Sequence, residues 1–289
     1  MLLAVSGLSC ASIAGLDDYG TANTGGAGGV GGTGGSATGS TTTGTGGAGP
    51  TTAYVEAVLN SGPAYYWRLG DEDIADGLPA VAELGGVDGA YGGLVSLAAG
   101  LVADSDGAAR FEPDGRMTVP AQSLGLMPGR PGTGTVADGF TVELWFQADG
   151  SSGSGTLASL RSDVGWAFRL RLENGDLYFD VAPLQGTGTI GPVSVGSGVH
   201  HVAATWRGGD QAGMFVVCLF VDGAQDCSGE NWGSFATPVP SAHLVVAAEE
   251  ADPGGATQAH FDGVIDEVAI YVPELSDSDV SEHFEVGSP

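Results

Sequence analysis

The sequence predicts an all-β fold, namely an antiparallel sandwich of two packed β-sheets. Short runs in which apolar and polar residues alternate are typical of half-buried antiparallel strands. Turn signals recur at intervals suited to a sandwich, and no amphipathic helical pattern separates the runs. A chain of 289 residues can form one large sandwich, which we expect at residues 52–289. The clearest runs are FTVELWF at 140–146, HHVAATW at 200–206, LFVDG at 219–223 and GVIDEVAIY at 263–271.

The charge of the chain restricts its partners. The formal net charge is −27, and all eight basic residues are arginines. Nucleic acid is excluded as a partner because the sequence offers no basic stripe for phosphates. An anionic membrane surface would repel the chain for the same reason.

The first residues predict a leader at 1–20 that carries a lipid-attachment cysteine. MLLAVSGLSC resembles the end of a bacterial lipoprotein signal peptide, which implies that Cys10 is lipid-modified and that the protein lies in the cell envelope, anchored to the outer membrane or extracellular. The sequence departs from that pattern because the positive n-region is missing and Gly7 stands where leucine is usual. A start codon upstream of Met1 would explain the missing charges; the alternative is an apolar leader with an incidental cysteine. No segment has the ~18 apolar residues of a membrane-spanning helix, so membrane contact is expected only through lipid.

Residues 21–51 are predicted to be a flexible linker. The stretch is dominated by Gly and Thr and has neither charged nor aromatic residues. Such a composition cannot bury enough surface to offset the entropy of ordering. The linker would therefore hold a folded domain away from the anchored cysteine.

The folded part is expected to open with a helix-like turn near residue 53 and a strand in AYYWRL at 64–69. Short apolar segments separated by glycine follow, and in FTVELWF alternation places Phe140, Val142, Leu144 and Phe146 on one face with Glu143 and Trp145 on the other. The short apolar segments that precede FTVELWF are LVSL at 94–97, ARFE at 109–112 and MTVP at 117–120.

A first hairpin is predicted in FRLRLENGDLYFDV at 168–181. Asn174-Gly175 is a signal for a two-residue type I′ turn, because both residues tolerate positive φ. This turn pairs Leu172 with Leu177 and Arg169 with Asp180, which leaves the leucines on the core face and the arginines opposite. We expect the Arg169–Asp180 pair to be an exposed ion pair of small energetic value.

A second hairpin is predicted in CLFVDGAQDC at 218–227, again around an Asp-Gly turn. Counting outward from Asp222-Gly223 places Cys218 directly opposite Cys227, at a spacing that permits a disulfide. With Cys10 assigned to lipid, the other two cysteines form an even pair, as expected in an oxidising compartment. Two free thiols are the alternative; a zinc site is disfavoured because no histidine partners lie nearby.

Together these runs resemble the concanavalin A-like, laminin G-like jelly-roll domains, in which a Tyr-Trp-Arg-Leu strand often opens the fold. The resemblance implies a non-catalytic binding or adhesion module that recognises a glycan or an extracellular protein. Similar domains carry the His200-His201 pair within a strand, where neighbouring side chains point to opposite faces, so we expect a structural role for both.

The resemblance also implies a tentative calcium site. Relatives often bind calcium between the loop after the first strand and the turn before the last, which here are ELGGVDGAYGG at 83–93 and GVIDEV at 263–268. Asp266 matches the family pattern, whereas Glu83 stands where relatives often have Asp and Asp88 where they often have Asn. Glu267 is expected on the opposite face from Asp266; the alternative is that one of the two binds backbone at a strand corner.

Catalysis is disfavoured. Glycoside hydrolases on this fold need two carboxylates about 5–5.5 Å apart on one face, and no strand offers such a pair. A glycoside hydrolase or lyase remains one alternative, and a passive envelope lipoprotein is another. If the ligand is a glycan, Trp166, Trp206 and Trp232 are candidates for stacking. Core packing is favoured for Trp166 and Trp206, so Trp232, in the loop-like DCSGENWGSF, is the best exposed candidate.

The chain is expected to end in a short acidic helix at 275–285. Ser276 is suited to be its N-cap, with Asp279 at the third helical position.

Overall fold

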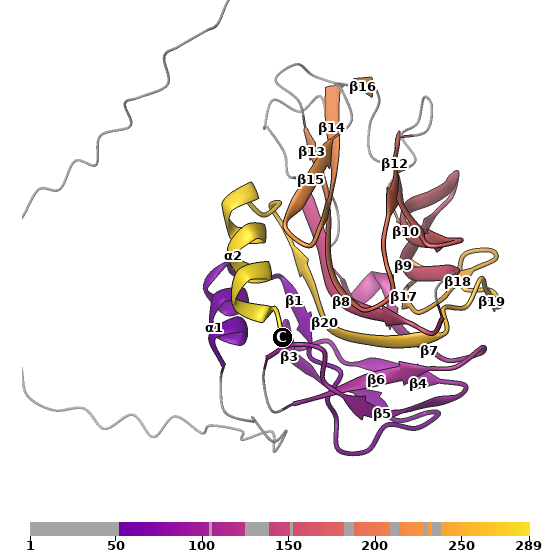
Figure 1. Cartoon of the computed structure of the whole chain (residues 1–289). Coiled ribbons are helices and arrows are strands. Elements are labelled where there is room, and N and C mark those ends of the chain that lie inside the picture. The colour runs from indigo at the N-terminus through magenta and orange to yellow at the C-terminus, as the bar shows by residue number, and fades with distance from the viewer. Residues whose placement is uncertain are drawn as a thin grey trace, which may run out of the picture. The chain divides into compact units, whose positions relative to one another are not determined.

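The computed structural model describes residues 52–103, 106–124, 139–150, 153–181, 188–208, 214–227, 231–232 (backbone only) and 238–289. The predicted leader, the predicted linker and Cys10 lie outside these ranges. Within them the chain forms two antiparallel β-sheets packed face to face, with two α-helices and a small third ribbon (Figure 1). The predicted all-β sandwich is confirmed. No helix in the described ranges is long and apolar enough to cross a membrane.

The first sheet has ten strands among the described residues. Along its main path they are β15 (Ala224–Cys227), β14 (Met214–Val221), β13 (Val199–Gly208), β8 (Phe140–Ala148), β20 (Gly263–Tyr271), β1 (Tyr65–Trp67) and β3 (Ala82–Leu84). Three more join its sides: β16 (Asn231–Trp232) pairs with β14, β6 (Gly107–Phe111) with β20, and β5 (Val95–Ala99) with β6.

The second sheet has eight strands. In spatial order they are β12 (Gly188–Ser194), β11 (Asp176–Val181), β10 (Gly165–Glu173), β9 (Gly155–Ser162), β17 (His243–Val246), β7 (Arg116–Pro120), β4 (Gly89–Gly92) and β2 (Pro79–Ala80). A short 3-10 helix (Ala121–Ser123) follows β7. The separate ribbon consists of β18 (Glu249–Glu250) and β19 (Thr257–Gln258).

The main core lies between the two sheets and follows the predicted alternation. Phe140, Val142, Leu144 and Phe146 of β8 all point into it. Across from them lie residues of the second sheet such as Phe168, so burial of this apolar surface is the principal stabilising contribution to the sandwich.

A second core lies on the other side of the first sheet, beneath α1 (Ala53–Asn60) and α2 (Asp277–Gly287) (Figure 1). Trp145 of β8 points into it, as alternation predicts, and packs edge-on against Tyr54 of α1 with ring centroids 5.9 Å apart. The predicted cap of α2 is confirmed, because the Ser276 side chain accepts from the Asp279 N–H while the Asp279 carboxylate accepts from the Ser276 N–H. Both helices therefore cover one face of one sheet.

Both predicted hairpins form in the predicted register. Leu172 pairs with Leu177, and Arg169 pairs with Asp180. The turn residues Asn174 and Gly175 have φ of 54° and 85°, as a type I′ turn requires.

In the second hairpin Cys218 pairs with Cys227, and the two form a disulfide with Cα atoms 4.1 Å apart. The predicted pairing is thus confirmed.

Candidate functional site

The faces of the sandwich differ in what covers them. On the first sheet, α1 and α2 cover the part of the outer face that forms the second core. Both α-helices of the described residues pack there, so neither covers the outer face of the second sheet. Among the described residues, the outer face of the second sheet is therefore the face that no α-helix covers.

Beneath α2 lies a buried charged centre built around Glu143 of β8. Its Oε1 lies 2.7 Å from His201 Nε2 and 3.0 Å from His283 Nδ1, and all three side chains are buried. Burial alone would raise the pKa of Glu143, but the two histidines hold it well below its usual range. Burial alone would lower the pKa of His283, but Glu143 raises it. The centre thus holds α2 on the sheet through a buried ion pair.

His283 also bridges Glu143 to Ser61, because its Nε2 lies 2.9 Å from Ser61 Oγ. This connectivity is that of a serine, histidine and acid relay. Acyl transfer also needs free N–H donors for an oxyanion. Here the N–H groups of Ser61 and Gly62 both donate to carbonyls of α1. We therefore regard the relay as structural.

The residues predicted for calcium do not assemble into a metal site. Asp266 is buried, and its Oδ2 accepts the Leu101 N–H at 2.8 Å. Asp88 Oδ1 accepts the Ala82 N–H at 2.9 Å, and Glu83 is exposed on β3. Among the described residues no group of three or more His, Cys, Asp or Glu side chains could hold a metal ion. A calcium site at Asp266, Glu83 and Asp88 therefore stays a prediction.

The expectation that Asp266 and Glu267 lie on opposite faces is wrong. The register shifts between Asp266 and Ala269, and Glu267 has φ of 56°. This bulge inserts one residue between Ile265 and Val268, which both point into the main core. Asp266 and Glu267 consequently share the helix-covered side.

There, Glu267 is buried and accepts from Tyr66 Oη and, at 3.2 Å, from Arg68 Nε. Arg68 also pairs with Asp106 at 3.1 Å. Arg68 and Glu267 thus form a second buried ion pair, next to the bulge of β20.

The outer face of the second sheet carries a row of stacked aromatic and guanidinium groups. The Arg161 guanidinium carbon lies 3.7 Å from the ring centroid of Trp166, and that of Arg169 lies 4.6 Å from the same centroid. Further along β10, the Arg171 guanidinium lies 4.2 Å from the ring centroid of Tyr178 on β11. All five side chains are half-buried, so each keeps part of its surface in solvent. We call these five residues the Arg-Trp-Tyr row.

Carboxylates hold two of the three arginines of this row, Arg169 and Arg171, in place. Asp180 Oδ2 lies 2.8 Å from Arg169 Nη2 and 2.8 Å from Arg171 Nε, and Arg169 Nη1 lies 3.2 Å from Glu249. Burial alone would lower the pKa of Arg171, but its hydrogen bonds to Asp180 and Glu173 raise it. The predicted Arg169–Asp180 ion pair therefore forms, but its predicted exposure is wrong, because the pair is half-buried within a network.

The β18–β19 ribbon lies beside β9 (Figure 1) and contacts the row through its two glutamates. Glu249 accepts from Thr156 Oγ1 at 3.0 Å, and the Glu250 carbonyl accepts from Arg161 Nε at 2.9 Å. Glu250 also binds His243 Nδ1 at 2.7 Å through its carboxylate. Both glutamates are nearly buried, so the ribbon is fixed to the sheet by polar contacts.

A comparison with known families places this architecture. The family model for the concanavalin A-like lectin/glucanases superfamily, of the laminin G type, matches residues 127–281, just over half of the chain. The chain belongs to this superfamily. No curated protein matches the sequence.

Solved structures with a similar fold include a domain in complex with a sugar and a toxin binding domain. Domain 4 of AbnA, a GH43 extracellular arabinanase from Geobacillus stearothermophilus in complex with arabinotriose, is similar with a TM-score of 0.54 and 17% identity, over 76% of this chain and 97% of that chain. The botulinum neurotoxin serotype D binding domain is similar with a TM-score of 0.51 and 12% identity, over 79% of this chain and 52% of that chain. At these identities the likeness concerns the fold alone.

Core packing was the favoured prediction for Trp166, but its side chain lies half-exposed on the surface. Strict alternation would put Trp166 on the same face as Phe168 and Leu170. The register of β10 against β9 shifts between Trp166 and Phe168, and both Ala167 and Phe168 point into the main core. The extra residue turns Trp166 to the outer face.

The other predicted site residues have different outcomes. Trp206 is buried in the main core, as expected. For Trp232 of β16 the structure describes only the backbone, which pairs with that of Met214 in β14. The Trp232 side chain lies outside the described part of the chain. His200 and His201 point to opposite faces, as predicted, since His200 packs on Phe146 of the main core and His201 on Trp145 of the second.

Proposed function

We propose that this protein is a non-catalytic glycan-binding module whose ligand lies on the outer face of the second sheet. The observation that carries the proposal is the half-exposed Trp166 held between hydrogen-bonding groups in the Arg-Trp-Tyr row. Protein sites for sugars combine an aromatic surface with a few fixed polar groups, and this row offers both. The similarity in fold to a domain in complex with arabinotriose supports the proposal.

The chemistry of the row favours a neutral sugar. Arg169 and Arg171 pair with three carboxylates, those of Asp180, Glu249 and Glu173, whereas Arg161 binds backbone carbonyls. The three positive and three negative charges of these residues therefore nearly cancel. Guanidinium N–H groups donate and carboxylate oxygens accept, so neighbouring hydroxyl groups of one sugar could bind both. A strongly charged glycan would disturb this balance.

A glycan array tests the proposal. We expect the wild type to bind one or more neutral oligosaccharides, and Trp166→Ala to lose at least ~10-fold in affinity, because stacking and burial of an aromatic ring contribute more than about 1.4 kcal/mol. Leu97→Ala is the matched control, since Leu97 is 52% exposed on β5 of the other sheet. Absence of glycan binding, or equal losses in both variants, would refute the proposal and favour protein adhesion.

Two additions to the array separate the alternatives. Repeating it with a chelator tests the predicted calcium: loss of binding would establish a cation dependence that the described residues do not explain. Measuring reducing ends released from bound oligosaccharides tests a hydrolase, for which Asp180 and Glu249 around Arg169 would be the candidate carboxylates. We expect no release, because both carboxylates are bound to Arg169, whereas a glycoside hydrolase directs its pair of carboxyl groups at the scissile bond.

We also propose that the module is displayed from the cell envelope through lipid on Cys10, as the sequence of residues 1–10 indicates. Metabolic labelling with a fatty acid analogue in a bacterial host tests this. Label should enter the wild type and be lost in Cys10→Ser. Label retained in that variant would exclude Cys10 as the attachment site.

A further inference from the structure

The two sulfurs of the Cys218–Cys227 disulfide lie in different surroundings. Cys218 is 1% exposed within β14, whereas Cys227 belongs to the exposed edge strand β15. A thiol arriving from solvent would therefore reach the Cys227 side of the bond.

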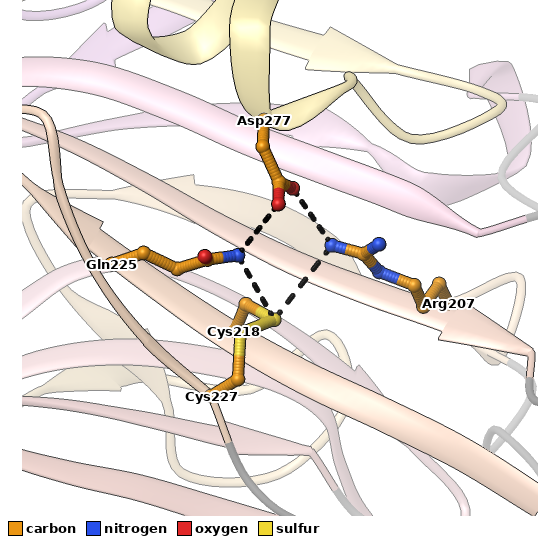
Figure 2. The surroundings of a disulfide bond; sticks show 5 residues. All are labelled: Arg207, Cys218, Gln225, Cys227 and Asp277. Atoms are coloured by element: carbon orange, nitrogen blue, oxygen red, sulfur yellow. Dashed lines mark hydrogen bonds and ion pairs between the residues drawn. A yellow bond between two sulfur atoms is a disulfide. The ribbon is translucent and has the colours of Figure 1, made fainter. Parts of the chain in front are cut away.

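The buried sulfur has hydrogen-bond donors around it (Figure 2). Cys218 Sγ lies 3.8 Å from Arg207 Nη2 and 3.8 Å from Gln225 Nε2. Both donors are held by Asp277 at the start of α2, at 3.0 Å each. A cation and an amide thus already face the atom that would carry negative charge if the disulfide opened.

We propose that this disulfide is a thiol–disulfide exchange site for low-molecular-weight thiols, with Cys227 as the attacked sulfur and Cys218 as the leaving group. An incoming thiolate forms a bond to Cys227 Sγ, the Cys218–Cys227 bond breaks, and its electron pair stays on Cys218 as a thiolate. The product is a mixed disulfide on Cys227 and a Cys218 thiolate that accepts hydrogen bonds from Arg207 and Gln225. No net oxidation occurs.

The surroundings of the disulfide favour attack on Cys227 over attack on Cys218. Exchange is faster when the attacked sulfur is accessible and the leaving thiol has a low pKa. Nearby cations lower thiol pKa values. Attack on Cys218 would instead require access to a buried sulfur and would expel Cys227, on a strand whose four residues are all exposed.

Peptide mapping after reaction with reduced glutathione tests the direction. The native protein is incubated with excess glutathione, quenched with acid at early times and then alkylated with N-ethylmaleimide. We expect glutathione on Cys227 and the maleimide on Cys218. Glutathione found mainly on Cys218, shared equally, or absent until the protein is denatured would overturn the proposal.

Rates of adduct formation test the role of Arg207. Removing its charge in Arg207→Gln should slow the reaction about threefold or more, because the leaving thiol becomes more basic. Arg110→Gln is the matched control, because Arg110 pairs with Asp149 away from the disulfide. Equal rates in Arg207→Gln and Arg110→Gln, with both proteins folded by circular dichroism, would refute the assigned leaving group.

Discussion

Replacing Glu143 by Gln should destabilise the protein strongly, because Glu143 is the only acid in the buried centre it forms with His201 and His283. The carboxylate binds two imidazoles at 2.7 and 3.0 Å in a site without solvent. Removing one partner of a buried ion pair costs about 3–5 kcal/mol. The Gln side-chain oxygen can still accept one neutral hydrogen bond, worth about 1 kcal/mol. We therefore expect Glu143→Gln to lower the free energy of unfolding by about 2–4 kcal/mol.

The difference in free energy of unfolding between wild type and Glu143→Gln should depend on pH within a defined range. The pKa of Glu143 is lowered in the folded state, so its contribution is present above about 4.3, its unfolded pKa, and is lost as pH falls toward the folded pKa. The pKa of His283 is raised, so its contribution is complete below about 6.5 and is lost as pH rises through the folded pKa. The difference should be largest between these two values.

Urea denaturation of both proteins at pH 3, 5.5 and 9 measures this window. Glu112→Gln is the control, since Glu112 is exposed after β6 and its substitution should change the free energy of unfolding by less than about 0.5 kcal/mol. A pH-independent difference, or a loss below about 1 kcal/mol at pH 5.5, would refute the reasoning that a buried ion pair holds α2 in place.

Three further predictions concern other parts of the fold. The double variant Cys218→Ser, Cys227→Ser should lose about 2–3 kcal/mol of unfolding free energy, because the disulfide closes a loop with a sequence separation of 9 and so lowers the entropy of the unfolded chain. A thermal melt that matches that of the wild type would contradict this. Ser276→Ala should cost about 1 kcal/mol by removing the cap of α2, as denaturant titration can measure, and no change would show that the cap is not stabilising. The hydrogen bond that His200 donates to the Asp222 carboxylate raises the pKa of His200, so Asp222→Asn should bring that pKa down toward about 6.5 in an NMR titration, whereas an unchanged value would assign the shift to another group.

Much of the sandwich was predictable because alternation and turn chemistry agree within its strands. In both hairpins a two-residue turn fixes the pairing, so counting from Asn174 or Asp222 gives the observed partners, including the disulfide. The predicted strand at 263–271 also matches β20 residue for residue. These features are local and depend on few residues.

The candidate site was harder to predict because it depends on departures from alternation. Trp166 reaches the surface through an extra residue in β10, and strict period-two counting cannot anticipate a bulge. Glu249 and Glu250 were missed because they contact β9 and β10, far away in sequence. Two adjacent acids after the apolar run HLVVAA were the signal that could have drawn attention to them.

The most direct test of glycan binding on the second sheet uses the indole N–H signals of the five tryptophans. They can be followed by two-dimensional ¹H–¹⁵N NMR while the best oligosaccharide from the array is added. We expect the Trp166 signal to shift in proportion to binding, while the signals of the buried Trp67, Trp145 and Trp206 stay in place. A shift of the Trp232 signal with Trp166 unchanged would contradict the proposed site and move the ligand to β16.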